Sequence, residues 1–213
     1  MELPNIFVYT HDSVALGEDG PTHQPVEHMV TLRSTPNMNN WRPADLVETA
    51  IAWKNAVSSK STPTCLIFSR QGTSALERTS EQLSLISMGG YLLDANENMD
   101  ITIVASGSEV QLALDAAKEL KNDSINANIV SMPSLDIFLE QNEDYQNTVI
   151  NHDKPVLVVE CSHPNSWYKI LNRNDKVIGI ETFGESAPGN ELLEHFGFTK
   201  ENVIETAKSL VND

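Results

Sequence analysis

The stretch that decides the fold is Thr64-Cys65-Leu66-Ile67-Phe68, an unbroken apolar run that ends at Ser69-Arg70-Gln71. Such runs are typical of strands in parallel sheets that are covered on both faces. A second β-rich run, Ile6-Phe7-Val8-Tyr9-Thr10, lies near the start of the chain, and helical patterns separate the two runs. We therefore expect two parallel strands that are joined through helices.

The segment between these two strands is predicted to hold two helices. Residues 25–33 have helical spacing, and residues 36–40 form a turn cluster rich in asparagine. The clearest helix follows, with Pro43 in its first turn and acidic Asp45 and Glu48 near its start, as helix N-termini prefer. Its expected apolar, buried side consists of Leu46, Val47, Ala50, Ile51 and Val57. We also expect all three tryptophans to pack in the interior, namely Trp41, Trp53 and Trp167.

The rest of the chain alternates strand and helix patterns. The predicted strands are Ile101–Val104, Ala127–Val130, Val156–Val159 and Val177–Ile180. The predicted helices are an amphipathic one around residues 112–120, a helical stretch over residues 136–150 that is broken near Asn142, and two more over residues 191–196 and 200–211. This alternation predicts an α/β fold with a mostly parallel sheet and helices on both faces.

The first part of the chain, by contrast, offers only two strands before a mixed stretch begins. A two-stranded parallel sheet cannot cover both of its faces, so residues 1–72 are predicted to be half of an α/β domain. We take residues 73–90 as a linker and residues 91–213 as a second α/β domain.

The composition is that of a globular protein with a strong acidic excess. The 213 residues include 30 acidic and 14 basic side chains, which gives a net charge of −16, and 40% of the residues are hydrophobic. This charge argues against a nucleic acid or an anionic membrane as partner. The net charge is −2 up to Arg78 and −14 in the remainder, so an anionic ligand is expected in the first part. The simpler explanation is that the acidic part is only a solvated surface.

Three further features concern location. The two cysteines, Cys65 and Cys161, lie in apolar runs and cannot form a disulfide framework, which fits a reducing compartment. The first residues lack the pattern of a secretory signal, and no apolar stretch approaches the roughly 18 residues that span a bilayer. We therefore expect a soluble, cytoplasmic protein.

The residues that could carry chemistry gather in the loop at residues 10–25. This loop follows a strand and precedes a helix, so it lies at the carboxyl edge of the predicted sheet, where ligands bind in open α/β folds. It contains His11, Asp19 and His23, and Arg70 ends the next strand at the same edge. Together these residues offer imidazoles for proton transfer, a carboxylate for hydroxyl groups and a guanidinium that can grip a phosphate.

Each of these features also has a structural explanation. A histidine at a strand end is often a hydrogen-bonded structural group, and Asp19-Gly20 is a common turn signature. Gly107-Ser108-Glu109 either holds an anion at a helix N-terminus or contains a plain N-cap at Ser108. A metal site is disfavoured because the spacing of its candidate ligands matches no tetrahedral pattern: His23, Glu27 and His28.

Several strings of this sequence together resemble the transketolase family. The most distinctive is Gly17-Glu18-Asp19-Gly20-Pro21-Thr22-His23-Gln24-Pro25, accompanied by Tyr9-Thr10-His11-Asp12-Ser13, Trp41-Arg42-Pro43-Ala44-Asp45 and Ser69-Arg70-Gln71. The similarity continues through Ala105-Ser106-Gly107-Ser108-Glu109-Val110, Val130-Ser131-Met132-Pro133-Ser134 and Thr182-Phe183-Gly184-Glu185-Ser186-Ala187-Pro188. It covers essentially the whole chain.

The resemblance implies roles for four residues. His11 and Arg70 match the residues that hold the substrate's phosphate in the family, and Asp19 matches the carboxylate that reads a sugar hydroxyl. His23 matches the histidine that contacts the donor's oxygens near the thiazolium carbon, and it is the one catalytic residue expected here. The resemblance assigns no cofactor-binding residue and no metal ligand to this chain.

The resemblance also implies what surrounds the chain. Transketolases use thiamine diphosphate and Mg²⁺ to transfer a two-carbon ketol unit from a ketose phosphate to an aldose phosphate in the pentose phosphate pathway. This chain resembles the end of their pyrimidine-binding domain and their C-terminal domain. The ligands of the diphosphate and the metal, and the glutamate that activates the cofactor, belong to upstream parts of the family's sequence. We therefore expect a portion of a homodimeric enzyme that is inactive alone.

Two other interpretations differ in kind. The chain could be a non-catalytic α/β module that serves association or regulation, because its acidic second part has no cluster of candidate catalytic residues. It could also be the C-terminal subunit of a split enzyme, although such a subunit should contain a complete pyrimidine-binding domain.

Overall fold

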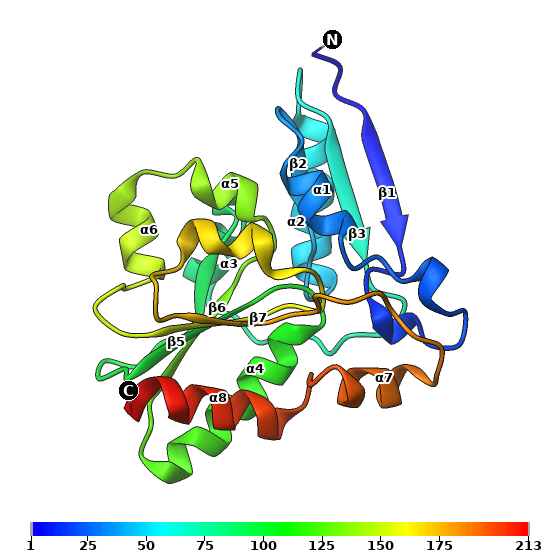
Figure 1. Ribbon diagram of the computed structural model, residues 1–213. Helices are drawn as coiled ribbons and strands as arrows, with labels where there is room; N and C mark the ends of the chain where they lie inside the picture. The colour runs from blue at the N-terminus through cyan, green and yellow to red at the C-terminus, as the bar shows by residue number, and fades with distance from the viewer. Residues whose placement is uncertain (1, 213) are drawn as a thin grey trace.

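A computed structural model describes residues 2–212 and contains two sheets (Figure 1). The first has the strand order β1-β3-β2 and comprises β1 (Ile6–Thr10), β2 (Asn39–Trp41) and β3 (Thr64–Phe68). The second has the order β4-β6-β5-β7-β8 and comprises β4 (Tyr91–Asp94), β5 (Ile101–Ala105), β6 (Ala127–Ser131), β7 (Val156–Val159) and β8 (Lys176–Ile178). The fold is mixed α/β with mostly parallel sheets, which confirms the predicted fold class.

In the first sheet β1 and β2 both pair with β3 in parallel, and the β1–β3 register runs from Ile6 opposite Thr64 to Thr10 opposite Phe68. The prediction of a turn over residues 36–40 is wrong at its end, because Asn39 and Asn40 belong to β2. Tertiary partners stabilise this polar strand. The Asn40 side-chain amide donates to Leu32 O and, at 2.7 Å, to the Asp136 carboxylate.

Two helices cover β3 on opposite faces and leave β1 exposed beyond Ile6. Met29 of α1 (His28–Arg33) packs with Cys65 and Ile67, whereas Leu66 belongs to the core cluster that includes α2 (Leu46–Ser58). The apolar side chains of β1 remain exposed: Phe7 38%, Val8 48% and Tyr9 44%. Because β1 also ends the strand order, one of its edges and both of its faces are open, as in half of an α/β domain.

The predicted buried side of α2 is wrong. Leu46 is 84% exposed and Val57 is 67% exposed, whereas Glu48, Ala52 and Ala56 face the interior. Trp53, which we expected to pack, is 39% exposed for the same reason. No described element covers this outward side of α2, and the buried Glu48 is stabilised by polar partners that lie far away in the sequence.

The second sheet contains the four strands expected from the sequence and one more. Within it, β5, β6, β7 and β8 pair in parallel, and β4 adds to the β6 edge in antiparallel orientation. The apolar run at residues 101–105 lies in the middle of this sheet and is fully buried. The sequence pattern missed β4 because this short edge strand alternates buried and more exposed residues.

Helices cover both faces of the second sheet (Figure 1). α4 (Glu109–Leu120) and α8 (Lys200–Asn212) pack on one face, while α5 (Leu135–Leu139), α6 (Glu143–Val149) and the 3-10 segment η5 (Pro164–Ile170) cover the other. The predicted break at Asn142 is confirmed, since its Oδ1 caps α6 by accepting from Tyr145 N at 2.8 Å. Within residues 2–212, none of the helices combines the length and apolar character needed to traverse a bilayer.

The remaining elements connect the two sheets and flank the second. They are the 3-10 turns η1 (Val14–Leu16), η2 (Pro21–His23), η3 (Ile86–Met88) and η4 (Lys121–Asp123), with the helices α3 (Ser80–Leu85) and α7 (Gly189–His195). η1 contacts α7, which joins the loop after β1 to the C-terminal part of the chain.

Candidate functional site

The loop between β1 and α1 lies at the carboxyl edge of the first sheet. His11 directly follows Thr10, whose partner in the register is Phe68, and Arg70 comes two residues after Phe68. The two candidate phosphate ligands therefore follow adjacent parallel strands and leave the sheet at the same edge. This is the position where open α/β folds bind ligands.

A groove of about 300 Å³ opens beside this loop. Its walls include His11 and His23 from the loop, His28 from α1, and apolar Tyr9 and Ile67 from the sheet. The structure thus brings together two of the four residues predicted from the sequence.

Both histidines are held in the same way. His11 Nδ1 lies 2.7 Å from the hydroxyl oxygen of Thr10, and His23 Nδ1 lies 3.0 Å from that of Thr22. Among residues 2–212, neither Nε2 atom has a hydrogen-bond partner. When the threonine hydroxyl donates to Nδ1, the proton of the neutral ring is on Nε2, which can then donate to an oxygen of a ligand.

Asp19 and Arg70 are placed differently. Both are exposed, and neither lines the groove. Asp19 lies in a turn in which Gly20 N donates to Gly17 O at 3.0 Å, so the turn expected from Asp19-Gly20 is present. Within the described residues, Arg70 makes no hydrogen bond or ion pair, which leaves its guanidinium available at the sheet edge.

The residues considered as metal ligands do not form a site. His28 lies 3.8 Å from Glu27 on the surface, with both side chains more than 60% exposed. Among residues 2–212, no group of three or more histidine, cysteine, aspartate or glutamate side chains is arranged to hold a metal ion.

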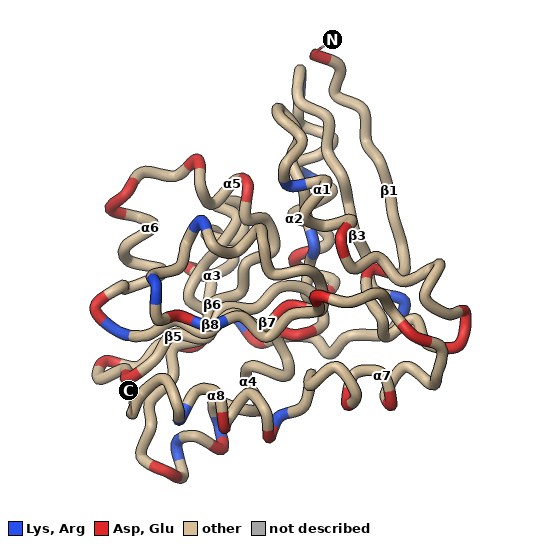
Figure 2. Tube along the Cα trace, viewed as in Figure 1, with Lys and Arg blue, Asp and Glu red and all other residues tan. Residues whose placement is uncertain are grey.

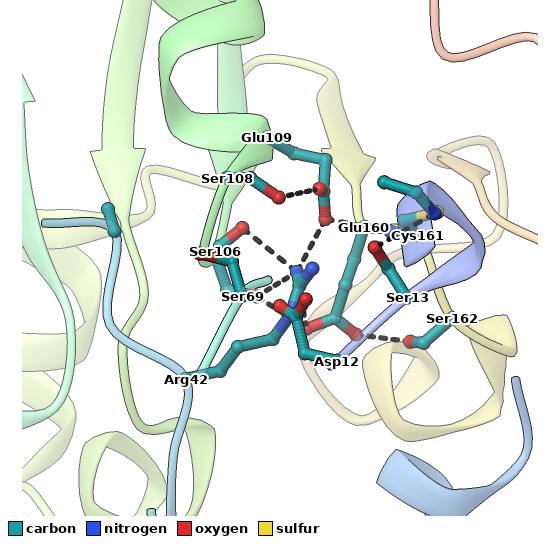
Figure 3. A network of polar contacts seen from close by, with 12 residues as sticks. Asp12, Ser13, Arg42, Ser69, Ser106, Ser108, Glu109, Glu160, Cys161 and Ser162 are labelled. Atoms are coloured by element: carbon teal, nitrogen blue, oxygen red, sulfur yellow. Dashed lines mark hydrogen bonds and ion pairs between the residues drawn. The ribbon is translucent and has the colours of Figure 1, made fainter. Parts of the chain in front are cut away.

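Behind the loop lies a buried network of charges that centres on Arg42 (Figure 3). Its Nε donates to Asp12 Oδ2 at 2.8 Å, and its Nη1 donates to Ser106 O at 3.0 Å and to Glu109 Oε2 at 2.5 Å. Burial by itself would lower the pKa of Arg42, but the charges of Asp12, Glu109 and Glu160 hold it well above its ordinary value. The network therefore joins the start of the loop to the second sheet.

Glu160, at the end of β7, is the second centre of this network. Both of its oxygens accept from Arg33 at 2.7 Å, and Trp167 and Ser162 donate to Oε2. Burial by itself would raise the pKa of Glu160, but Arg33 and Arg42 hold it well below its ordinary value of 4.5. Two arginines of the first part thus pair with Glu109 and Glu160 of the second part and with Asp12 of their own part.

A second buried cluster joins α2 to β4. Arg78 donates to Asp45 Oδ2 at 2.7 Å, and Tyr91 donates to Glu48 Oε1 at 2.7 Å. Burial would raise the pKa of Asp45, but the hydrogen bonds from Arg78 and from two backbone amides, together with the charge of Arg78, lower it below its ordinary value. This cluster explains why an acidic residue of α2 faces the interior.

The N-cap role considered for Ser108 in Gly107-Ser108-Glu109 is wrong, and the anion site considered there stays a prediction. Ser108 occupies the N-cap position of α4, but its hydroxyl donates to Glu109 Oε1 at 2.7 Å and does not cap the helix. Gly107 has φ +57°, and a Cβ there would lie 2.7 Å from the guanidinium carbon of Arg42. The close packing of Arg42 against Gly107 therefore determines the conformation of this segment, and no sequence pattern predicted that contact.

Comparison with known proteins agrees with this architecture. Residues 1–74 match the family model for the transketolase pyrimidine binding domain, and residues 89–199 match the one for the transketolase-like TK C-terminal domain. The chain belongs to the transketolase family. Transketolase 1 of Vibrio parahaemolyticus is 50% identical over 213 residues, which are 99% of this chain and 32% of that protein. The chain thus spans about a third of the length of the curated transketolases that it matches.

Solved structures of the family have the same fold. Transketolase from Pichia stipitis in complex with sedoheptulose-7-phosphate superimposes with a TM-score of 0.93 at 43% identity, over 99% of this chain and 30% of that one. A split-gene transketolase, an inactive beta4 tetramer, gives a TM-score of 0.72 at 24% identity, over 97% of this chain and 67% of that one. At this lower identity the likeness concerns the fold alone.

Proposed function

We propose that this chain is the C-terminal portion of a transketolase and that it supplies the substrate-binding edge of a site for ketol transfer between sugar phosphates. One observation carries the proposal: His11 and His23 face one groove at the edge of the sheet where Arg70 also emerges. Family membership supports the class of reaction, in which a two-carbon ketol unit moves from a ketose phosphate to an aldose phosphate.

In this proposal each residue has a distinct task. Arg70 and His11 bind the phosphate of the sugar, because a free guanidinium and an Nε2 donor suit its oxygens. His23 contacts the oxygens of the donor sugar and can hold or release a proton there through Nε2. Asp19 accepts a hydrogen bond from a sugar hydroxyl.

The cofactor that we propose for the whole enzyme is thiamine diphosphate with Mg²⁺, which supplies the carbon–carbon bond chemistry. Among the described residues, no group of three or more histidine, cysteine, aspartate or glutamate side chains is arranged to hold a cation, so they supply no such ligand set for the metal of this cofactor. We therefore assign those ligands to other parts of the polypeptide and derive no step of the reaction through the cofactor here.

The partners proposed for this chain are the rest of a transketolase polypeptide and a second subunit. The open edge and faces of β1, where Phe7 and Tyr9 stack with ring centroids 6.5 Å apart, support the first of these. Figure 2 shows no charged residue along β1, so a further strand and its helices can cover it without burying a charge.

The proposed division keeps residues 1–72 with the pyrimidine-binding domain, 73–90 as a linker and 91–213 as the C-terminal domain. The cytoplasm is the proposed location.

The test replaces the matching third of Vibrio parahaemolyticus transketolase 1 with this chain. We expect the chimera to transfer ketol units, and Arg70→Ala to lower kcat/KM for phosphorylated sugars roughly 30-fold or more, because loss of a charged partner costs about 2–5 kcal/mol. Arg173→Ala, which removes another exposed arginine far along the chain, is the control. Equal losses of activity on phosphorylated and unphosphorylated sugars would remove the role assigned to Arg70.

A second assay tests whether the chain is inactive alone. With thiamine diphosphate and Mg²⁺ supplied, we expect no ketol transfer by the isolated 213 residues. Turnover above background would contradict the assignment of the cofactor ligands to other parts of the enzyme. An inactive chimera that nevertheless assembles would favour the alternative, a non-catalytic module for association or regulation.

A further inference from the structure

Each histidine of the groove is followed directly by a buried residue that ties the loop to the second part of the chain, through Arg42 in the case of Asp12 and directly in the case of Gln24. Asp12 follows His11 and is 2% exposed, and Gln24 follows His23 and is 3% exposed. Asp12 accepts from Arg42, which is anchored on Ser106 and Glu109. The loop is thus attached at both of its ends to residues that lie near the C-terminal sheet.

Gln24 makes the attachment next to His23. Its Nε2 donates to Glu185 O at 2.8 Å and to Gly17 O at 3.0 Å, and its Oε1 accepts from Glu185 N at 3.1 Å. The side-chain amide therefore pairs with the backbone of Glu185 as one strand residue pairs with another. It also ties the Gly17 turn to the same point.

The surrounding backbone leaves little space for movement. A Cβ at Gly184 would collide with Oε1 of Gln24, and a Cβ at Gly17 would lie 2.9 Å from Gly189 N. Gly17 has φ +88°, so glycine is required there on conformational grounds as well. Residues 184–189 therefore fit closely around the loop, and η1 lies against α7 in Figure 1.

We infer that Gln24 is a positioning residue and that residues 184–189 of the C-terminal part form the template that holds His23 at the groove. This inference rests on the proposed function for its catalytic meaning. It gives the C-terminal part a task in the reaction, although none of the side chains described for that part, up to residue 212, lines the groove.

Three variants test the inference. Gln24→Ala removes the amide from the loop side. Gly184→Ala displaces the same amide from the template side, at a glycine whose φ is not in the left-handed region. Glu185→Ala is the control, because its side chain is 62% exposed beside His195 and only its backbone contacts Gln24.

The first readout is the imidazole NMR spectrum of the 213-residue chain. We expect Gln24→Ala and Gly184→Ala to shift the His23 resonances and to leave those of His152 unchanged, since His152 lies far from the loop. Glu185→Ala should affect only His195. The most severe contact of a Cβ at Gly184 is with the Gln24 amide, and Gln24→Ala leaves only the contact with Cβ at 3.1 Å. Adding Gly184→Ala to Gln24→Ala should therefore shift the His23 resonances much less than Gly184→Ala does alone.

The second readout is kcat/KM of the chimera described above. Misplacement of a reacting group by about 1 Å can cost about 100-fold, so we expect both variants to lose roughly 10- to 100-fold, and Glu185→Ala to stay within twofold. Activity within twofold for Gln24→Ala and Gly184→Ala, or lost activity with unmoved His23 resonances, would overturn the inference. If the unaltered chimera is inactive, the proposed function fails, while the spectra still decide whether Gln24 positions His23.

Discussion

Arg42 is the residue on which the contact between the two parts of the chain depends most. It is 1% exposed, and its guanidinium serves Asp12, Ser106 and Glu109 at once. Arg42→Met keeps much of the side-chain volume and removes the charge. Among the described residues, the variant leaves the buried Asp12 and Glu109 without an arginine partner, and Glu160 keeps Arg33.

We expect a loss of about 3–5 kcal/mol in the free energy of unfolding at pH 7, because removal of one partner of a buried pair leaves an uncompensated charge. The size follows from the burial of the groups left behind, since Asp12 is 2% and Glu109 is 4% exposed. Arg173→Met, at an exposed position, should change the free energy by less than about 0.5 kcal/mol.

The pH dependence of the free energy of unfolding tests the same prediction independently. The pKa of Glu160 is lowered in the folded state, so its contribution to stability is complete above about 4.5 and is lost as the pH falls through the folded value. Arg42→Met removes part of this stabilisation, because the charge of Arg42 helps to lower the pKa of Glu160. The difference between wild type and variant should therefore stay nearly constant from pH 7 to about 4.5 and narrow as the pH falls further.

Urea unfolding followed by circular dichroism at several pH values measures both effects. A loss below about 1 kcal/mol at pH 7 would show that the network contributes little beyond what packing supplies. A difference that widens toward low pH would show that the buried carboxylates do not carry the charge assigned to them.

Two further predictions concern a glycine and the cysteines. Gly89→Ala should lower the free energy of unfolding by about 2–4 kcal/mol, because Gly89 has φ +88° and a Cβ there would collide with Ser134 O. Gly72→Ala is the control, since a Cβ at Gly72 meets no atom within 4 Å. Thermal melting curves of the two variants that coincide would contradict this prediction. At pH 8, a thiol reagent should modify Cys65 and Cys161 at least about tenfold more slowly in the native chain than in the urea-unfolded chain. The reason is that burial raises the pKa of Cys65 to about 11 and raises the pKa of Cys161 well above its ordinary value. Equal rates in the two states would show that the thiols are accessible.

Much of the fold was predictable because buried parallel strands are continuous apolar runs. β3, β5 and β7 were all located in this way, and Asn142 marked the break between α5 and α6. The strand β2 was not predicted, because its asparagines are stabilised by partners that are distant in the sequence, such as Asp136, almost a hundred residues away. Periodicity alone does not reveal such partners.

The helix α2 shows the limit of pattern analysis most directly. Its apolar stripe through Leu46 and Val57 predicted a buried face, and that face is open to solvent. The buried face contains Glu48, which is compatible with burial only because Arg78, from the loop before α3, and Tyr91 of β4 bind its carboxylate. Hydrophobic spacing identified a contact surface of α2, but not whether the described residues occupy it.

The sequence predicted which residues gather at the candidate site, and the structure shows how they are arranged there. His11 and Arg70 were expected at one edge of the sheet, and the β1–β3 register has them there. That His11 and His23 share a groove while Asp19 and Arg70 stay outside its lining depends on how the loop folds. Their individual roles stay predictions.

The sequence by itself determined the α/β class, the positions of most strands along the chain, the family resemblance and the loop that carries the candidate residues, because these depend on local patterns and contiguous motifs. Only the tertiary structure decided the pairing of Arg42 with Asp12 and Glu109, and of Gln24 with the backbone of Glu185. These contacts join residues 30 to 161 positions apart. Their stability comes from burial and mutual charge compensation, which arise only when distant segments are packed together.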